Sequence, residues 1–508
     1  MEPLDRHAHA ADAGFDGGDL DCGSGLLLLI REHLDPLPRG GLLEFTSTDA
    51  GADEDVPAWC RLTGNELVSW TRTGRTRSFL VCKGVLSDRR AGPAASPPSA
   101  SSVARLPTVP VATPKALERP APAPQVAALS AMGVGSWPRP RWLVEAIHAH
   151  LEGRLGGAEF EATADDAVRL SIAAQERAGL DVVTDGEQRR DSYANFVGDR
   201  LDNCRSIPLT DLLPLVEHPE RLEEEFRSLD VPASQVRHPA VFGPLSRGRP
   251  IAAHELDFAR SVTTKPVKVA LPGPYVLSRV MWLECVADRA YASRETLARD
   301  IVRVLREEVH ALLARGAAIV QLDEPVLTEV VHGRAASSRS FMCGALSERG
   351  EVDVELALAR DWINEVVAGL PRERLAVHVC RGNWTKDESA ALSGDYGPLV
   401  PLLASLNVGT YFLELATPRA GEVERLAALP GDRRVGVGVA NPKHDRIETV
   451  DEVLHRARRA IDVLGRERVL LVPDCGFATF ADSPVATAHV AEAKLRALAA
   501  ASAHLRGG

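Results

Sequence analysis

Short runs of β-branched and apolar residues recur eight times in the last three quarters of the chain, and helical stretches separate them. The eight runs are Met132–Trp137, Asp181–Gly186, Val267–Leu271, Ala318–Leu322, Leu375–Cys380, Thr410–Leu415, Arg434–Val439 and Val469–Val472. Regular alternation of strand and helix favours a parallel sheet, and eight repeats favour a closed (β/α)8 TIM barrel. In such an α/β barrel, functional side chains lie at the carboxyl ends of the strands.

A stretch rich in Pro, Ala and Ser precedes these repeats in the chain of 508 residues. Between residues 91 and 124 it contains few large apolar side chains to bury, which predicts an extended, semi-rigid linker. We therefore expect a small domain at residues 1–88, a linker at 89–127 and the barrel at 128–508.

The first 88 residues carry helix and strand signals of their own. These predict helices at Gly25–Leu34 and Val56–Thr63, and strands at Gly41–Thr48, Glu66–Trp70 and Arg77–Lys83. This order, with the segment DVPAWCRLTGNELVS in its middle, resembles the TusA-type sulfur-carrier family. The resemblance implies a small two-layer α+β fold.

The sulfur-carrying cysteine of that family lies at the start of the first helix, in a Cys-Pro-x-Pro motif that is missing here. Only Cys22 is near this position. Because free N–H groups at a helix N-terminus favour a thiolate, the resemblance implies that Cys22 carries a persulfide. A domain that has lost this role is the alternative.

The charge and the apolar runs exclude several classes of protein. The net charge is −11, with 59 Lys and Arg against 70 Asp and Glu, and no basic stripe is present, so nucleic acid is not an expected partner. No apolar run approaches the roughly 20 residues that span a bilayer, and the acidic N-terminus is unlike a signal peptide.

The eight cysteines are too sparse for a disulfide framework. We expect a cytoplasmic protein whose cysteines serve metal or thiol chemistry.

Candidate metal ligands occur at the ends of three predicted strands. His378 and Cys380 are two residues apart, which directs both side chains to the same side of a strand. Glu414 and Cys475 follow two other strands. Imidazole and thiolate ligands favour Zn²⁺ over magnesium or calcium. The sequence predicts a zinc site formed by these four residues, in which an incoming thiol displaces Glu414.

The motifs GSWPRP, DGEQRR, LDEP, HVC, FLEL and PDCG, in this order, resemble the catalytic barrel of cobalamin-independent methionine synthase over residues 128–508. The resemblance implies the same four zinc ligands. It also implies that Gly135, Ser136, Glu187 and Asp323 hold the amino acid thiol. Judged from the residues alone, Glu187 and Asp323 could instead be acids that cap helices.

The sequence departs from this family at the methyl donor and at the proton donor. The second barrel that helps the family to hold folate is replaced by the small domain, so the donor is either methyl-folate or a methyl-corrinoid protein. Where the family has Asp-x-His, this chain has Asn441-Pro442-Lys443-His444, which leaves Lys443 and His444 as candidate acids.

We expect a zinc-dependent methyltransferase that acts on the thiolate of homocysteine or a similar thiol. In a second interpretation, a persulfide on Cys22, loaded by a sulfur-donor protein, supplies sulfur for a carbon–sulfur bond formed at the barrel. In a third, the chain is a zinc-binding or sulfur-trafficking protein without catalysis.

Overall fold

The computed structural model describes Leu4 and residues 6–18, 26–34, 36–49, 51–89, 108–114, 116–208, 237–282, 290–333, 350–384, 386, 388 and 391–507. Their contacts divide them into two compact units, one formed by the described residues up to 89 and the other by those from 108 onward. Cys22 lies outside the described residues.

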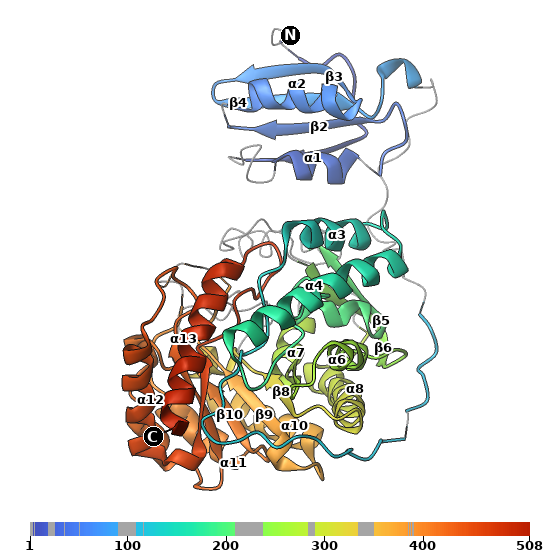
Figure 1. The fold of residues 1–508 in the computed structure, drawn as a ribbon. Coiled ribbons are helices and arrows are strands. Elements are labelled where there is room, and N and C mark those ends of the chain that lie inside the picture. The colour runs from blue at the N-terminus through green and yellow to red at the C-terminus, as the bar shows by residue number, and fades with distance from the viewer. Residues whose placement is uncertain are drawn as a thin grey trace. The chain divides into compact units, whose positions relative to one another are not determined.

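The smaller unit is a four-stranded mixed sheet with two helices (Figure 1). Its elements in chain order are β1 (Ala13–Asp16), α1 (Leu26–Leu34), β2 (Leu42–Ser47), α2 (Ala52–Thr63), β3 (Glu66–Thr73) and β4 (Thr76–Cys82). The strands are ordered β1-β2-β4-β3; β1 is parallel to β2, and β4 is antiparallel to both of its neighbours. The predicted two-layer α+β arrangement is present, and β1 is an additional strand.

Both helices of this unit pack on the same face of its sheet. Leu26, Ile30 and Leu34 of α1 and Val56, Trp59 and Cys60 of α2 form one buried cluster with alternate residues of β2 and β4, such as Phe45 and Phe79. The intervening residues Leu42, Leu80 and Cys82 belong to a separate cluster. Because successive strand residues point to opposite faces, the α1 and α2 side chains cover one face.

The larger unit contains six parallel strands in chain order. They are β7 (Lys268–Pro272), β8 (Ile319–Asp323), β9 (Leu375–Val379), β10 (Thr410–Leu413), β11 (Arg434–Ala440) and β12 (Val469–Pro473). Parallel bridges from Ala131 to Leu471, from Met132 to Val182 and from Val183 to Val267 close the ring through two short segments. The predicted eight-membered barrel is therefore confirmed.

Helices surround this ring (Figure 1). They are α3 (Arg141–Leu151), α4 (Gly157–Ala178), α6 (Ala253–Val262), α7 (Pro274–Met281), α8 (Arg294–Ala314), α9 (Leu327–His332), α10 (Val352–Val367), α11 (Val400–Ser405), α12 (Val450–Leu464) and α13 (Ala488–Gly507). An antiparallel pair, β5 (Asp202–Pro208) and β6 (Arg237–Ser246), is added outside the ring. The main apolar core lies between strands and helices, and a smaller one, with Val134, Ile319 and Phe412, fills the barrel interior.

Residues 108–114 and 116–127 of the predicted linker run along the outside of the barrel without helix or strand (Figure 1). Backbone groups of this segment bond to barrel side chains. Nδ1 of His310 lies 2.9 Å from the Glu118 carbonyl, and Arg434 donates to the Val126 carbonyl at 2.9 Å. This part of the chain is thus attached to the barrel through its main chain.

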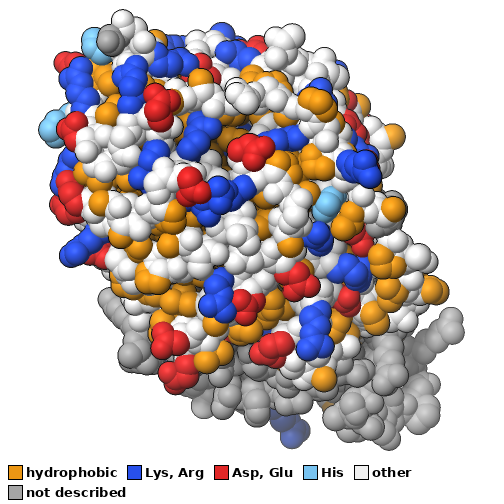
Figure 2. Space-filling view, turned by 90° about the horizontal axis from the view of Figure 1, so that it is seen from below, with side chains coloured by type: hydrophobic (Ala, Val, Ile, Leu, Met, Phe, Trp, Pro, Cys, Tyr) orange, Lys and Arg blue, Asp and Glu red, His pale blue; other side chains and the backbone are white. Residues whose placement is uncertain are grey.

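On the face of the larger unit seen in Figure 2, Lys and Arg side chains are interspersed with Asp and Glu. In the part of the chain that the structure describes, no helix is both long enough and apolar enough to span a bilayer.

Candidate metal centre

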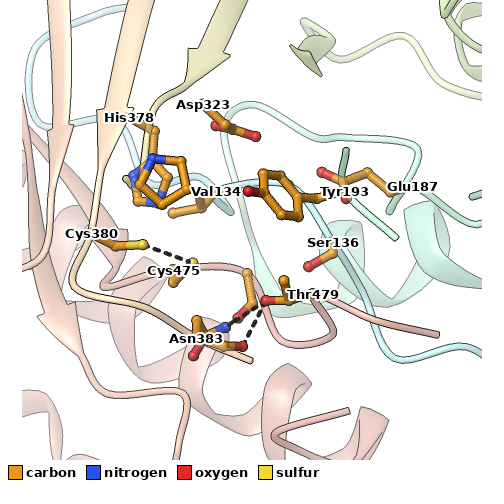
Figure 3. Close-up of a pocket in the computed structure, with 13 residues that line it drawn as sticks. Val134, Ser136, Glu187, Tyr193, Asp323, His378, Cys380, Asn383, Cys475 and Thr479 are labelled. Carbon is orange, nitrogen blue, oxygen red and sulfur yellow. Dashed lines mark hydrogen bonds between the residues drawn. The ribbon is translucent and has the colours of Figure 1, made fainter. Parts of the chain in front are cut away.

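A pocket opens at the carboxyl ends of the barrel strands. Its lining residues are Val134, Gly135, Ser136, Glu187, Tyr193, Asp323, Pro325, His378, Cys380, Asn383, Cys475, Gly476 and Thr479. Figure 3 shows the imidazole of His378 and the two cysteine sulfurs on one side and the carboxylate of Glu187 on the other, with Tyr193 between them. The cysteine thiols and the carboxylates therefore face the same cavity.

Three side chains of this pocket form a cluster of possible metal ligands. One ligand atom each of His378, Cys380 and Cys475 lies within 4.8 Å of the others, and the two sulfurs are 3.9 Å apart. His378 is the fourth residue of β9, Cys380 follows that strand, and Cys475 lies two residues beyond β12. The strand ends thus bring together residues 95 positions apart in the sequence.

The orientation of His378 suits a metal ion. Its Nδ1 lies 3.0 Å from the carbonyl oxygen of Phe412, so in the neutral ring this nitrogen carries the hydrogen and Nε2 keeps its lone pair. Nε2 is buried and has no hydrogen-bond partner among the described residues. A buried acceptor nitrogen beside two sulfurs is the ligand set that zinc prefers.

The electrostatics of the cluster favour a thiolate. The hydrogen bond from Cys475 and the interaction with His378 hold the pKa of Cys380 well below its usual value, although burial opposes this. Burial alone would lower the pKa of His378, but the neighbouring Cys380 outweighs it and the pKa is raised. Zinc held by His378, Cys380 and Cys475 would keep a bound thiol in its anionic form near neutral pH.

Glu414, the fourth predicted ligand, is next to this cluster but is not part of it. Its Oε2 accepts a hydrogen bond of 2.8 Å from the backbone N–H of Arg381, and its Oε1 accepts one of 2.8 Å from Arg419. The side chain is buried, and burial raises its pKa. The structure thus brings three of the four predicted ligands together and pairs the fourth with an arginine.

All four residues that were predicted to hold the thiol substrate line the pocket: Gly135, Ser136, Glu187 and Asp323. A Cβ atom on Gly135 would lie 2.2 Å from Oε1 of Glu187, so this position has no room for a side chain. Burial raises the pKa of Glu187 to about 7, and its Oε2 is buried without a partner in the described ranges. Such a carboxylate is suited to receive a cationic group.

Asp323 does not cap the helix after its strand, since α9 begins after Val326 without a side-chain cap, and its neighbour Glu324 instead caps α7. Both carboxylate oxygens of Glu324 accept backbone N–H groups at the start of α7, from Tyr275 at 2.9 Å and from Val276 at 2.8 Å. Asp323 instead accepts a 2.6 Å hydrogen bond from Gln321 and faces the pocket.

Neither of the candidate acids lines the pocket. Lys443 and His444 lie in the loop after β11. Lys443 is buried, and its backbone N–H bonds to Asn441. Although burial opposes it, the pKa of Glu388 is lowered by the hydrogen bond from Asn441 and by Arg419, with a smaller effect of the nearby Lys443. Nδ1 of His444 is buried and has no partner within the described part of the chain.

Three polar residues that line the pocket, Tyr193, Asn383 and Thr479, were not predicted from the sequence. The amide of Asn383 donates to the Gly476 carbonyl at 2.8 Å and to Thr479 at 3.2 Å, and the Thr479 hydroxyl donates to the Asn383 carbonyl at 2.8 Å. These bonds join the loops that follow β9 and β12. Asn383 and Thr479 follow Cys380 and Cys475 closely in the sequence, and this proximity could have identified them as residues of the site.

The comparisons with known proteins agree with this geometry. The model of the family described as "Cobalamin-independent synthase, Catalytic domain" matches residues 129–499. The chain belongs to the cobalamin-independent methionine synthase family. It is accordingly a methyltransferase of this family.

Methionine synthases of two archaea are similar to the barrel. The protein of Sulfurisphaera tokodaii is 30% identical over 344 residues, which are 68% of this chain and 84% of that protein. The protein of Sulfolobus acidocaldarius is 29% identical over the same shares of the two chains.

Solved structures of the family are similar as well. A B12-independent methionine synthase from Shewanella sp. W3-18-1, in complex with selenomethionine, is 26% identical with a TM-score of 0.55, covering 75% of this chain and 98% of that chain. A Listeria monocytogenes protein, 20% identical with a TM-score of 0.54, shares the fold over 75% of this chain and 99% of its own.

Proposed function

We propose that this methyltransferase transfers a methyl group to the thiolate of homocysteine or of a closely similar amino acid thiol. The observation that carries the proposal is that the His378, Cys380 and Cys475 cluster opens onto the same pocket as the carboxylates of Glu187 and Asp323. A molecule that has a thiol at one end and an ammonium group at the other matches both sides of this pocket.

The substrate is oriented by groups of this chain. The carboxylates of Glu187 and Asp323 receive the α-ammonium group, and the hydroxyl of Ser136 donates to the α-carboxylate. These contacts place the sulfur at the cysteine side of the pocket. The Shewanella relative was solved with selenomethionine, the selenium analogue of methionine, which supports an amino acid of this shape.

The transfer itself is a displacement at the methyl carbon. The substrate thiol releases its proton to solvent on binding, and the electron pair of its sulfur forms the new carbon–sulfur bond. The bond between the methyl carbon and its donor breaks, and the donor keeps that electron pair. Zinc held by His378, Cys380 and Cys475 would supply a positive charge that stabilises the thiolate, with Glu414 as a carboxylate that could hold the metal before the thiol binds. A folate leaving group needs a proton, for which Lys443 and His444, in the loop after β11, are the candidates.

The test is methionine formation by the zinc-loaded full chain. Homocysteine is offered with methyl-folate, with methylcobalamin, or with neither. Methionine from either donor supports the proposal and identifies the donor. Cys475→Ala should abolish the product, whereas Cys204→Ala, another buried cysteine that lies outside the pocket, should not. Absence of methionine with both donors, despite bound zinc, would contradict the proposal and favour the non-catalytic interpretation.

Sulfur transfer through Cys22 stays a prediction. The same assay addresses it when the chain is first loaded with persulfide by a sulfur-donor protein. Product formation that requires this loading and is lost in Cys22→Ala would favour sulfur transfer. Methionine formation by Cys22→Ala at the wild-type rate would exclude it as the main activity.

A further inference from the structure

A fully buried lysine lies beneath the pocket, inside the barrel. Lys268 is the first residue of β7 and has no exposed surface. Its Nζ donates to Oε1 of Gln321 at 2.6 Å and to the carbonyl of Val134 at 2.7 Å, and it lies 4.2 Å from the ring centre of Phe412. Burial of an amino group costs folding free energy, which its hydrogen bonds offset only in part. The position of Lys268 inside the barrel therefore suggests a role beyond packing.

These contacts determine how the amide of Gln321 is oriented. The bond from Nζ to Oε1 turns the oxygen of the amide toward the lysine, as a protonated amino group, which has only donors, requires. The nitrogen of the amide then faces the other way and donates to Oδ1 of Asp323 at 2.6 Å. Burial lowers the pKa of Lys268 to about 7, but Nζ carries enough hydrogens for both of its bonds in either protonation state.

The chain of bonds ends at a wall of the pocket. Asp323 lines the pocket, and its Oδ1 is occupied by Gln321. No described residue donates a hydrogen bond to its Oδ2. We propose that Lys268 is a positioning residue for amino acid recognition, which acts through Gln321 to hold Asp323 with one oxygen directed at the α-ammonium group of the substrate.

This inference rests on the proposed function, because it assumes that the bound thiol carries an ammonium group. A lysine with a purely structural role would affect the binding of all thiols equally, whereas a positioning lysine affects only thiols that carry an amino group. Loss of Lys268 frees the amide of Gln321 to turn over and frees Asp323 to rotate. The affinity for a thiol that carries the amino group falls, while the affinity for the same thiol without it does not change.

The experiment measures the binding of homocysteine and of 4-mercaptobutyrate, which lacks the amino group, to the zinc-loaded full chain by calorimetry. We expect Lys268→Met to weaken homocysteine binding at least tenfold and to change 4-mercaptobutyrate binding less than twofold. Gln321→Glu keeps the acceptor for Lys268 but loses the donor to Asp323, and it should give the same result. The double variant should be no weaker than the single ones, because both act through one contact.

Lys494→Met is the matched control. Lys494 is also buried, and its Nζ bonds to Glu448 at 2.9 Å, outside the pocket. Its replacement should leave the preference for homocysteine intact. If Lys268→Met fails to fold, Gln321→Glu tests the same contact.

Retention of the wild-type preference in Gln321→Glu, or an equal loss of both thiols in both variants, would overturn the inference. A wild-type chain that does not prefer homocysteine would instead contradict the proposed function.

Discussion

The guanidinium of Arg419 donates a 2.8 Å hydrogen bond to the buried carboxylate of Glu414, whose other oxygen accepts the backbone N–H of Arg381, the residue that follows Cys380. Arg419 also pairs with Glu388 on its other side. A carboxylate that is held by an arginine has less tendency to bind a metal. The proposal that an incoming thiol displaces Glu414 from zinc therefore predicts that this ion pair weakens the carboxylate as a competitor of the thiol.

Removal of this arginine should strengthen the competition from Glu414. In Arg419→Met, the buried carboxylate loses its cationic partner, and the metal becomes its best remaining one. We expect homocysteine to bind about fivefold to tenfold more weakly, in cobalt-substituted protein whose absorption spectrum reports the ligand set. An unchanged spectrum together with unchanged thiol affinity would mean that Glu414 does not compete.

Zinc retention should depend on all three clustered residues. Ala in place of His378, Cys380 or Cys475 leaves two ligands, so stoichiometric zinc should be lost after dialysis against a weak chelator. Metal analysis gives the content, and Cys204→Ala provides the control with a different buried cysteine. Full zinc content in Cys475→Ala would refute the assignment of the site.

The bonds between the two cysteine loops should support the metal indirectly. Asn383→Ala removes both amide bonds to the loop after β12, so Cys380 and Cys475 are held together less firmly. Zinc affinity should fall about tenfold or more, as is usual when a group that orients metal ligands is lost. A competition titration with a chromogenic chelator measures this fall. Wild-type affinity in the variant would show that the loops are positioned by other contacts.

The stability of the protein should depend on pH through Glu187. Burial raises its pKa from 4.5 to about 7, so between these values the folded chain keeps a proton that the unfolded chain releases. Stability from this group therefore falls as the pH rises through that range. Glu187→Gln removes the effect and should be more stable than the wild type above pH 7, by up to about 3 kcal/mol.

Urea unfolding of the metal-free proteins at pH 5 and pH 8 measures this difference. The free energy of unfolding of Glu187→Gln should exceed that of the wild type only slightly at pH 5 and by more at pH 8. Its affinity for homocysteine should be reduced. A variant that is less stable than the wild type at pH 8 would contradict the prediction.

Most of the barrel was predictable because strand and helix alternate regularly and each strand run is strongly apolar. The runs from Val267 onward match β7 to β12 within two residues at either end, whereas the first two runs pair through only one or two residues each. The metal cluster was also predictable, since His378 and Cys380 are two apart on a strand and Cys475 follows another.

Contacts between distant residues were not predictable. The pairing of Glu414 with Arg419 depends on how the loop after β10 folds back, which no sequence period encodes. The bonds of Asn383 and Thr479 join loops whose positions follow from barrel closure. The role of Lys268 was not predicted, because its burial follows only from the ring of strands around it.

The attachment of residues 108–114 and 116–127 to the outside of the barrel determines which fragments of this chain we expect to be stable when expressed. A fragment that begins at Leu129, near the start of the family match, would leave His310, Arg374 and Arg434 without the carbonyl groups of that segment. His310 and Arg434 would then lose these acceptors, and Arg374 would keep only the carbonyls of Ala317 and Leu313. A barrel expressed on its own should therefore begin near residue 108.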